Sequence, residues 1–295
     1  MATPSGIVVC AVYAALLVLP VPAARATDVV KPLKAEEFAV RYAYHFELLD
    51  AILETTVAEF GPYREEAFTA PMSVRREHEE ALLGNLINLM ISDAGHKELD
   101  EGMIPVPFPI DKGLLGYRVS LISRDNQAKI AGVVDIAGLR SLVIGQGANW
   151  GDVAIYEFNR IAVETAMDYN SLFPMLLHGR FDLFPRGVTE APQELAAYGA
   201  QYPGLAIDEH LLIKYRYAQF FYVSKSAPRL AERLLAGLER MAGDGSFDAL
   251  FARHFAESLS GLDLGRRVVI ELENPFLPAW VPFDREELWF GPQRF

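Results

Sequence analysis

Apolar side chains recur every three or four residues over several stretches of the chain, a pattern typical of helices with one buried face. The clearest stretch, residues 44–60, ends at Gly61-Pro62, a dipeptide that stops a helix. Ser73 can cap the next stretch, because its hydroxyl oxygen accepts from the first free backbone N–H groups of a helix. We predict helices at 44–60, 73–83, 150–159, 171–178, 189–198, 228–241 and 247–255, the last two divided by a turn at Gly243-Asp244-Gly245.

Short apolar runs lie between these helices, and we predict buried strands at 86–91, 118–123, 141–144, 181–184, 210–213 and 219–223. Strands that alternate with helices are typical of α/β folds, in which helices cover both faces of a sheet. The C-terminal tail, 274–295, is different, because Pro275, Pro278, Pro282 and Pro292 interrupt it. We expect the tail to be an extended segment laid across the surface.

The N-terminus reads as a targeting segment. Residues 7–19 form an apolar run of 13 residues, and Ala24-Arg25-Ala26 supplies the small residues that a signal peptidase recognises. A membrane-spanning helix needs about 20 apolar residues, so a cleaved signal peptide at 1–26 is the better interpretation. We therefore predict export to the periplasm with cleavage after Ala26. The first six residues contain no Lys or Arg, which leaves open whether Met1 is the true start.

Composition and charge narrow the classes of function. The 295 residues are 51% hydrophobic and 22% charged, as in ordinary globular proteins. The net charge of −12 disfavours nucleic acid as a partner, because binding phosphates requires a concentrated basic surface. Cys10 is the only cysteine, and it lies in the predicted signal peptide. The mature chain thus has no disulfide, no cysteine-ligated metal and no thiol nucleophile, and we expect no cofactor.

Four segments occur in a characteristic order: KGLLGYRVSLISRDN at 112–126, VVDIAGLRSLVIGQG at 133–147, MLLHGRFDLFPRG at 175–187, and FFYVSKSAPRLAERLLAGLERMAGDGSFDALFARHF at 220–255. In content, order and spacing they resemble the bacterial periplasmic solute-binding proteins of the amino-acid-binding type (family 3-like). The resemblance extends over residues 35–258.

The resemblance implies the type II periplasmic-binding fold, an α/β fold with two lobes, each a mixed sheet flanked by helices. Residues 27–123 and 216–295 would form lobe 1, and residues 124–215 would form lobe 2. Two hinge crossings, near 119–123 and 217–222, would let the lobes close on a solute, because contacts from both lobes favour the closed state.

The resemblance also implies a function. The protein would be a monomeric binding protein, not an enzyme, that captures a small polar or zwitterionic solute resembling an amino acid for a membrane transporter of the ABC type. Two alternatives remain open at this stage. The chain could instead be a ligand-sensing module for a signalling receptor, or a hydrolase or transglycosylase that uses paired carboxylates.

Four residues are candidates for the lobe 2 wall of the binding cleft. Asn149 and Trp150 begin a predicted helix, where the amide can make a directional hydrogen bond and the indole a flat apolar wall; the alternative for Trp150 is a core residue. Asp182 closes a strand where the family often has an acid that contacts the ligand's ammonium group; the alternative is a carboxylate bonded to backbone. Arg186 follows the same strand; the alternative is a surface charge.

Two further candidates come from lobe 1. Many amino-acid binders carry an arginine for the ligand carboxylate in a t-x-x-R segment after the third strand, and here Lys97 and Glu98 occupy that place. A bidentate carboxylate clamp is therefore not expected. Arg76 could reach the cleft from the helix at 73–83, although a solvated or ion-paired helix face is the alternative.

Motifs of common enzymes are absent or incomplete. His78-Glu79 begins the zinc-protease motif H-E-x-x-H, but Leu82 replaces the second histidine. Gly145-Gln146-Gly147 begins a dinucleotide fingerprint, but Trp150 replaces its third glycine. No Gly-x-Ser-x-Gly elbow marks a serine hydrolase. We therefore predict no metal site, no nucleotide site and no catalytic triad.

Overall fold

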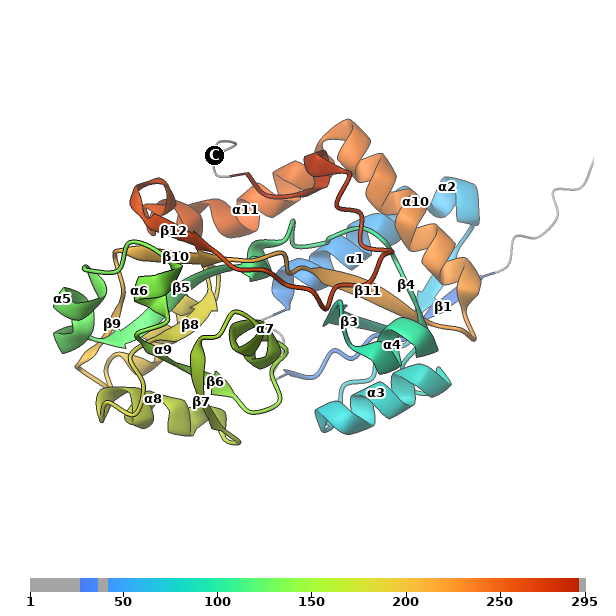
Figure 1. The fold of residues 1–295 in the computed structure, drawn as a ribbon. Helices are drawn as coiled ribbons and strands as arrows, with labels where there is room; N and C mark the ends of the chain where they lie inside the picture. Colours follow the sequence, from blue (N-terminus) through green and yellow to red (C-terminus); the bar gives the residue numbers. More distant parts are fainter. Residues whose placement is uncertain (1–26, 37–41, 292–295) are drawn as a thin grey trace, which may run out of the picture.

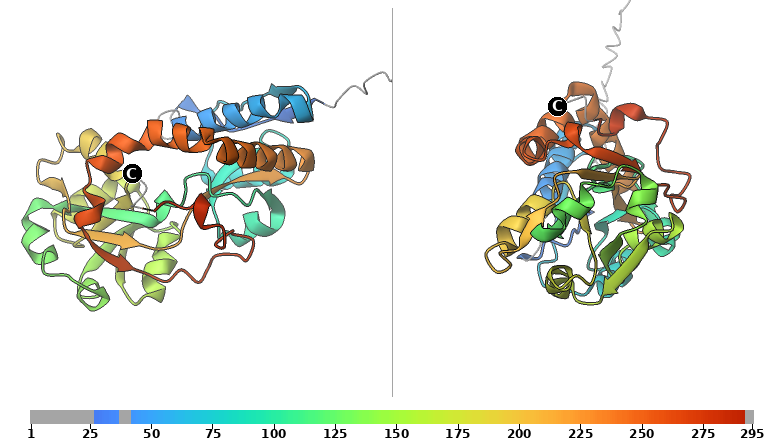
Figure 2. Two further views of the ribbon diagram at one scale, coloured as in Figure 1. Left: turned by 90° about the horizontal axis from the view of Figure 1, so that it is seen from above. Right: turned by 60° about the vertical axis from the view of Figure 1, so that its left-hand side comes forward.

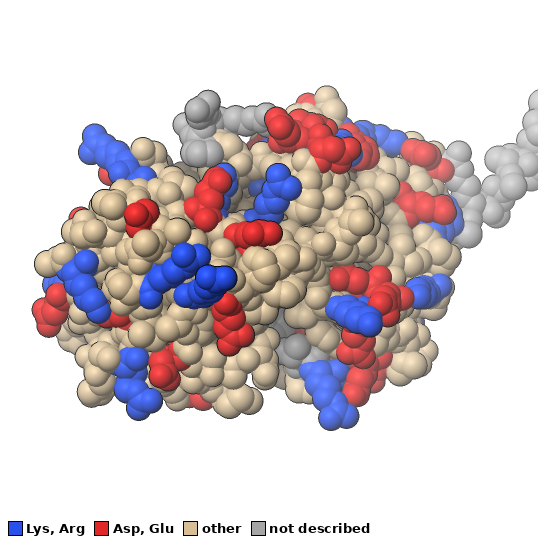
Figure 3. Space-filling view, in the orientation of Figure 1, with Lys and Arg blue, Asp and Glu red and all other residues tan. Residues whose placement is uncertain are grey.

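The computed structural model describes residues 27–36 and 42–291 (Figure 1). The expected signal peptide and its cleavage site lie outside these residues. None of the helices in the described ranges is long and apolar enough to cross a membrane. On the face shown in Figure 3, Lys and Arg side chains are interspersed with Asp and Glu.

The first sheet, which we call the β3 sheet, is built on β11 (Gln219–Ser224). β11 pairs antiparallel with β3 (Leu89–Asp93) on one side and with β4 (Met103–Pro105) on the other. β1 (Asp28–Val30) and β2 (Tyr63–Glu65) form a parallel pair, and a bridge from Pro32 to Leu89 joins them to β3.

Helices cover both faces of the β3 sheet, and the alternation along β11 explains why. Phe221 and Val223 belong to the core cluster beneath α1 (Ala43–Thr55), α10 (Pro228–Asp244) and α11 (Ser246–Ser260). Phe220 and Tyr222 belong to a separate cluster beside α3 (Val74–Leu83) and α4 (Lys97–Gly102). Successive strand residues point to opposite faces, so one apolar run fills two layers. α1, α10 and α11 lie side by side (Figure 2).

The second sheet, which we call the β5 sheet, is built on β5 (Tyr117–Ser123). β5 pairs antiparallel with β8 (Phe184–Gly187), β9 (Leu205–Ile207) and β10 (Leu211–Lys214), and β10 pairs parallel with β12 (Val268–Glu271). β6 (Val143–Gly147) and β7 (Ala162–Ala166) form a parallel pair, which a bridge from Ile144 to Leu183 joins to the chain just before β8.

Helices also cover both faces of the β5 sheet. One core cluster joins Ile122 and Ile144 to Ile155 of α7 (Asp152–Phe158). The other joins Leu121 and Phe184 to side chains of α8 (Tyr169–Leu177) and α9 (Ala191–Tyr198). The remaining helices are short: α2 (Val57–Phe60), α5 (Gln127–Ile130) and α6 (Ile136–Leu139). The β3 sheet and the β5 sheet lie in opposite halves of the molecule, and the surface is indented between them at the lower edge of Figure 3.

The C-terminal tail makes a connection that the sequence did not predict. After β12 the chain leaves the β5 sheet and returns to the β3 sheet, where Trp280 packs edge-on against Phe220 at a ring distance of 4.9 Å. The backbone N–H of Phe290 then donates to the Lys112 carbonyl (2.7 Å). The tail therefore forms a third link between the two halves, in addition to the link between β4 and β5 and the link between β10 and β11 (Figure 1).

All the predicted elements exist, with shifted bounds. The predicted helix at 44–60 is two helices, α1 and α2, and Ser73 caps α3 by accepting from the backbone N–H of Arg76 (3.4 Å). Of the turn predicted at 243–245, only Gly245 lies outside a helix. α10 runs to Asp244, and Gly245 adopts the left-handed φ of +81° before α11 starts. The predicted strands at 141–144 and 181–184 begin two to three residues later, at Val143 and Phe184.

Candidate functional site

A buried arginine lies where the two halves meet. Arg118 is the second residue of β5, and its guanidinium contacts Asp152 at the start of α7 (Nη2 to Oδ1, 2.7 Å). Its Nε donates to the hydroxyl of Tyr215, just after β10 (2.9 Å), and Tyr215 in turn donates to Asp152. Only 3% of the Arg118 side chain is exposed, so the guanidinium lies inside a closed ring of polar partners.

The partners of Arg118 stabilise its positive charge. Burial lowers the pKa of the Arg118 guanidinium, but the attraction of Asp152, Tyr215 and Glu190 outweighs burial and holds that pKa well above its ordinary value. Burial also raises the pKa of the Tyr215 hydroxyl well above its ordinary value. Arg118 is therefore a permanent cation, and Tyr215 is a neutral donor at any physiological pH.

A second buried arginine, Arg186, is linked to the first through a shared carboxylate. Glu190, just before α9, contacts Arg118 with Oε2 (3.5 Å) and Arg186 with Oε1 (3.3 Å). Glu194 contacts Arg186 at 2.8 Å, and its two oxygens both accept from the Arg186 Nε (2.9 Å each). Burial opposes the charge on Arg186, but Glu190 and Glu194 raise its pKa above the ordinary value. Two arginines and three carboxylates thus form one continuous network.

Arg186 lies over an aromatic surface. Its guanidinium carbon is 4.6 Å from the ring centre of Trp150 and 5.2 Å from that of Phe184. These two rings are stacked, with an interplanar angle of 15°. An indole face attracts a cation, and this contact fixes the plane of the guanidinium. Trp150 remains partly exposed, so the surface of the protein is open beside it.

The β3 sheet reaches this region through Asp93. Asp93 ends β3, accepts from the hydroxyl of Tyr217, and contacts His96 (Oδ2 to Nε2, 3.1 Å). The hydrogen bond to Asp93 raises the pKa of His96 more than burial lowers it. A Cβ atom on Gly151, just before α7, would lie 2.6 Å from the Tyr217 hydroxyl, so a larger residue there would displace that hydroxyl. The start of α7 therefore touches both the segment after β10 and the end of β3.

The structure brings together some of the predicted site residues. Asn149, Trp150 and Arg186 lie together, because β6 and β8 run in the same direction and the chain after β6 and the end of β8 reach the same edge. Asn149 is exposed in the turn before α7. Arg186 is 5% exposed and pairs with Glu190 and Glu194, so it is not a plain surface charge.

The other predicted site residues lie elsewhere. Asp182 is at the opposite end of β6, where its carboxylate contacts Lys129 (2.6 Å) and accepts from the backbone N–H of Val143 (3.0 Å). Arg76 and Lys97 are exposed, and each has an ion-pair contact at 3.9 Å with a glutamate of its own helix. These contacts are those of the structural alternatives, and binding roles for the three residues remain predictions.

Sequence reasoning missed Arg118, Asp152, Glu190 and Tyr215. Arg118 lies within the strand pattern RVSLIS, which predicts a strand but gives no sign of a buried partner. Its partners are 34 to 97 positions away in the sequence, and only the fold brings them together. Across residues 27–36 and 42–291, no group of His, Cys, Asp or Glu side chains is arranged to hold a metal ion.

Comparisons with known proteins agree with this architecture. No protein-family model matches the chain, and no curated protein matches it. Among solved structures, the GluR0 ligand-binding core in complex with L-glutamate matches with a TM-score of 0.54 and 12% identity, over 78% of this chain and 98% of that one.

A second match is a periplasmic His/Glu/Gln/Arg/opine family-binding protein from Silicibacter pomeroyi in complex with lysine. It has a TM-score of 0.54 and 11% identity, over 78% of this chain and 98% of that one. At this level of identity the likeness concerns the fold. The resemblance predicted from the sequence is thus confirmed as a structural one, and the chain has the two-lobed type II fold of the amino-acid-binding periplasmic proteins.

Proposed function

We propose that this protein is an exported binding protein that holds a small polar solute with at least one charged group between its two lobes and presents it to a membrane transporter. The observation that carries the proposal is that Arg186 lies over Trp150, and that Gly151, next to Trp150, lies beside the side chains of Tyr217 and of Asp93 at the end of β3. In open α/β sheets, ligands bind beyond the carboxyl ends of strands. Support also comes from the two structural neighbours, which are in complex with L-glutamate and with lysine.

The proposed site comprises Asn149, Trp150 and Arg186 on the lobe 2 side, with Asp93 and His96 opposite them. Trp150 offers a partly exposed ring, Asn149 an exposed amide, and the Asp93–His96 pair a partly exposed acid and base. Such a mixture of a flat apolar wall and groups of both charges suits a zwitterion. We leave Asp182, Arg76 and Lys97 outside the site because their contacts hold them elsewhere.

We propose that the half built on the β5 sheet moves as one lobe against the half built on the β3 sheet. The lobe boundary expected at 123/124 would divide β5 from β8, β9 and β10, with which it pairs, and the crossings expected near 119–123 and 217–222 fall largely within β5 and β11. The hinge would instead lie in the chain between β4 and β5 and in the chain between β10 and β11. β12 also pairs with β10, so the tail that follows β12 would bend together with the hinge. Closure would bring Asp93 and His96 toward Trp150 and would be favoured by a solute that contacts both.

The charge network supports a binding role over a catalytic one. Asp152, Glu190 and Glu194 each contact an arginine, so the three carboxylates of the network are held by the protein's own side chains. A sensor module would share the same binding step, and a permease that recognises only the closed form would distinguish a transport protein from a sensor.

The test begins with native mass spectrometry of protein purified gently from its own host, which shows the mass of any bound solute. Calorimetric titration of that solute then compares wild type with Arg186→Lys and Trp150→Ala. Lysine keeps the charge but loses the planar fork, so we expect affinity to fall by one to two decades, about 1.5–3 kcal/mol for hydrogen bonds to a charged group.

Arg180→Ala is the matched control, since Arg180 is an exposed arginine whose contact is with Glu164 at 3.9 Å. It should bind as wild type does. Thermal unfolding of each apo variant checks that the fold is intact. Unchanged affinity in both Arg186→Lys and Trp150→Ala would disprove the proposed site.

A further inference from the structure

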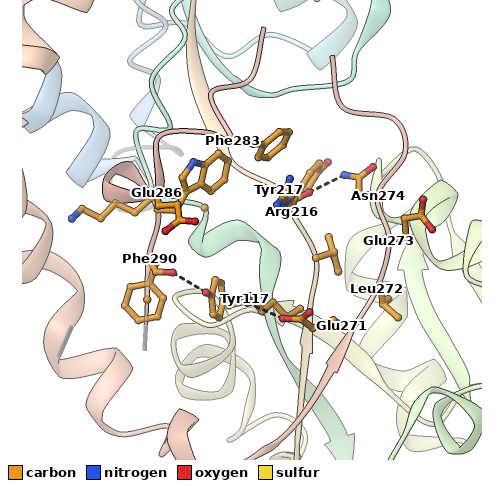
Figure 4. Close-up of a pocket in the computed structure, with 16 residues that line it drawn as sticks. Tyr117, Arg216, Tyr217, Glu271, Leu272, Glu273, Asn274, Phe283, Glu286 and Phe290 are labelled. Atoms are coloured by element: carbon orange, nitrogen blue, oxygen red, sulfur yellow. Dashed lines mark hydrogen bonds and ion pairs between the residues drawn. The ribbon is translucent and has the colours of Figure 1, made fainter. Parts of the chain in front are cut away.

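A cavity lies away from Trp150 and Arg186, between the segment that follows β10 and the C-terminal tail. Its volume is about 690 Å³, within the range of small-molecule sites. One wall is the chain from Lys214 to Tyr217, and the other is formed by the tail on both sides of the Pro278–Pro282 stretch (Figure 4). Neither Arg186 nor Trp150 lines it.

Its walls combine aromatic rings with charges. The rings are those of six residues, Tyr117, Tyr215, Tyr217, Phe283, Trp289 and Phe290. The guanidinium of Arg216 lies over the Phe283 ring, 4.5 Å from its centre, and the Phe283 and Trp289 rings are stacked with an interplanar angle of 25°. A flat apolar body can therefore lie beside a cation in this cavity.

The charges that line the cavity fall into two groups. Lys214 pairs with Glu271 (3.0 Å), and Lys112 pairs with Asp248 outside the cavity. Arg216, Glu273 and Glu286 have no ion pair with any residue in 27–36 or 42–291, and all three are exposed. One cation and two carboxylates are therefore available to a ligand.

We propose that this cavity is a second binding site, for a zwitterion with an aromatic body. The carboxylate of the ligand contacts Arg216, its ammonium group contacts Glu273 or Glu286, and its ring packs against Phe283 and Trp289. Charged hydrogen bonds fix the orientation, and the rings supply apolar contact. An aromatic amino acid has this chemistry.

The cavity can be altered without altering the proposed solute site. Tyr215 and Tyr217 also line the cavity, but their hydroxyls donate to Asp152 and Asp93, whereas the Arg216 guanidinium lies over Phe283. Removing the Arg216 side chain therefore leaves the hydrogen bonds of the two tyrosines in place.

The probe is L-tryptophan, titrated by calorimetry into wild type, Arg216→Ala and Phe283→Ala. We expect saturable binding to wild type and a loss of about ten- to a hundredfold in Arg216→Ala, as for removal of a hydrogen bond to a charged group. Indole-3-propionate, which lacks the ammonium group, and tryptamine, which lacks the carboxylate, should each bind more weakly than tryptophan.

Arg186→Lys and Arg180→Ala are the controls. Both should bind tryptophan as wild type does, because neither residue lines the cavity. Tryptophan affinity that falls in Arg186→Lys and is unchanged in Arg216→Ala would place the probe in the solute site and overturn the inference. Absence of saturable binding to wild type would overturn it as well, and it would leave the proposed function untouched.

Discussion

Replacing Arg118 with methionine tests whether the charge network at the junction of the two halves holds the fold together. The side chain is 3% exposed, and its main partner, Asp152, is 9% exposed. Removing one partner of a buried ion pair typically costs about 3–5 kcal/mol, because the remaining charge stays desolvated and unpaired. We expect Arg118→Met to lower the free energy of unfolding by that amount.

The companion variants separate the ion pair from simple packing. Asp152→Asn leaves Arg118 with Glu190 and the Tyr215 hydroxyl, so its cost should be smaller, about 1–3 kcal/mol. The double variant removes both charges, and its cost should fall short of the sum of the two single costs by at least about 1 kcal/mol.

Urea unfolding, followed by circular dichroism and by tryptophan fluorescence, measures each free energy of unfolding. The measurement is valid when both signals give the same unfolding transition, as two-state unfolding requires. Additive single costs, or a cost of less than about 1 kcal/mol for Arg118→Met, would refute the reasoning.

Two further outcomes follow from local geometry. Gly145→Ala should destabilise the fold by about 1–3 kcal/mol, because the new Cβ would lie 2.3 Å from the buried Phe181 ring. Gly243→Ala should stabilise the fold by about 0.5–1 kcal/mol, because Gly243 lies in α10 with open space around it. Thermal unfolding should therefore show a lower melting temperature for the first variant and a higher one for the second. The hydrogen bond that raises the pKa of His96 also helps to lower that of Asp93 against burial, so the pair stabilises most between their ordinary values of 3.8 and 6.5. The stability that His96 contributes is lost as pH rises through its raised pKa, and the stability that Asp93 contributes is lost as pH falls through its lowered pKa. Equal profiles of melting temperature against pH for wild type and His96→Gln would contradict this.

The sequence predicted an element best when the pattern that indicates it lies within the residues of that element. The helix at α10 has apolar residues at helical spacing and a glycine, Gly245, at its end, and both features are local. β12 has four residues and β1 has three, too short for a period to show. Their assignment depends on partners more than 30 residues away, such as β10 for β12. Local physics therefore predicts long elements well and short edge strands poorly.

The candidate site was predicted in part for a related reason. Arg186 and Asp182 are four positions apart, and the sequence offered both as cleft residues. An extended chain rises about 3.3 Å per residue, so four positions separate their backbones by roughly 13 Å. That is enough to place Arg186 beside Trp150 and Asp182 at the far end of β6, with Lys129. Charge type suggested both residues, but only the direction of the strand decides which one faces the other half.

The segment from Tyr215 to Tyr217 links the two sites that we propose. Its tyrosines donate to Asp152 and Asp93 beside the proposed solute site, and all three of its residues line the cavity. If lobe closure shifts this segment, a ligand in either site that prefers one position of the segment changes the affinity of the other site. Linkage requires the two effects to be equal, so tryptophan must alter solute affinity by the same factor by which solute alters tryptophan affinity. A rigid segment would make that factor one, and the tail that spans the hinge beside it determines how far the segment can move.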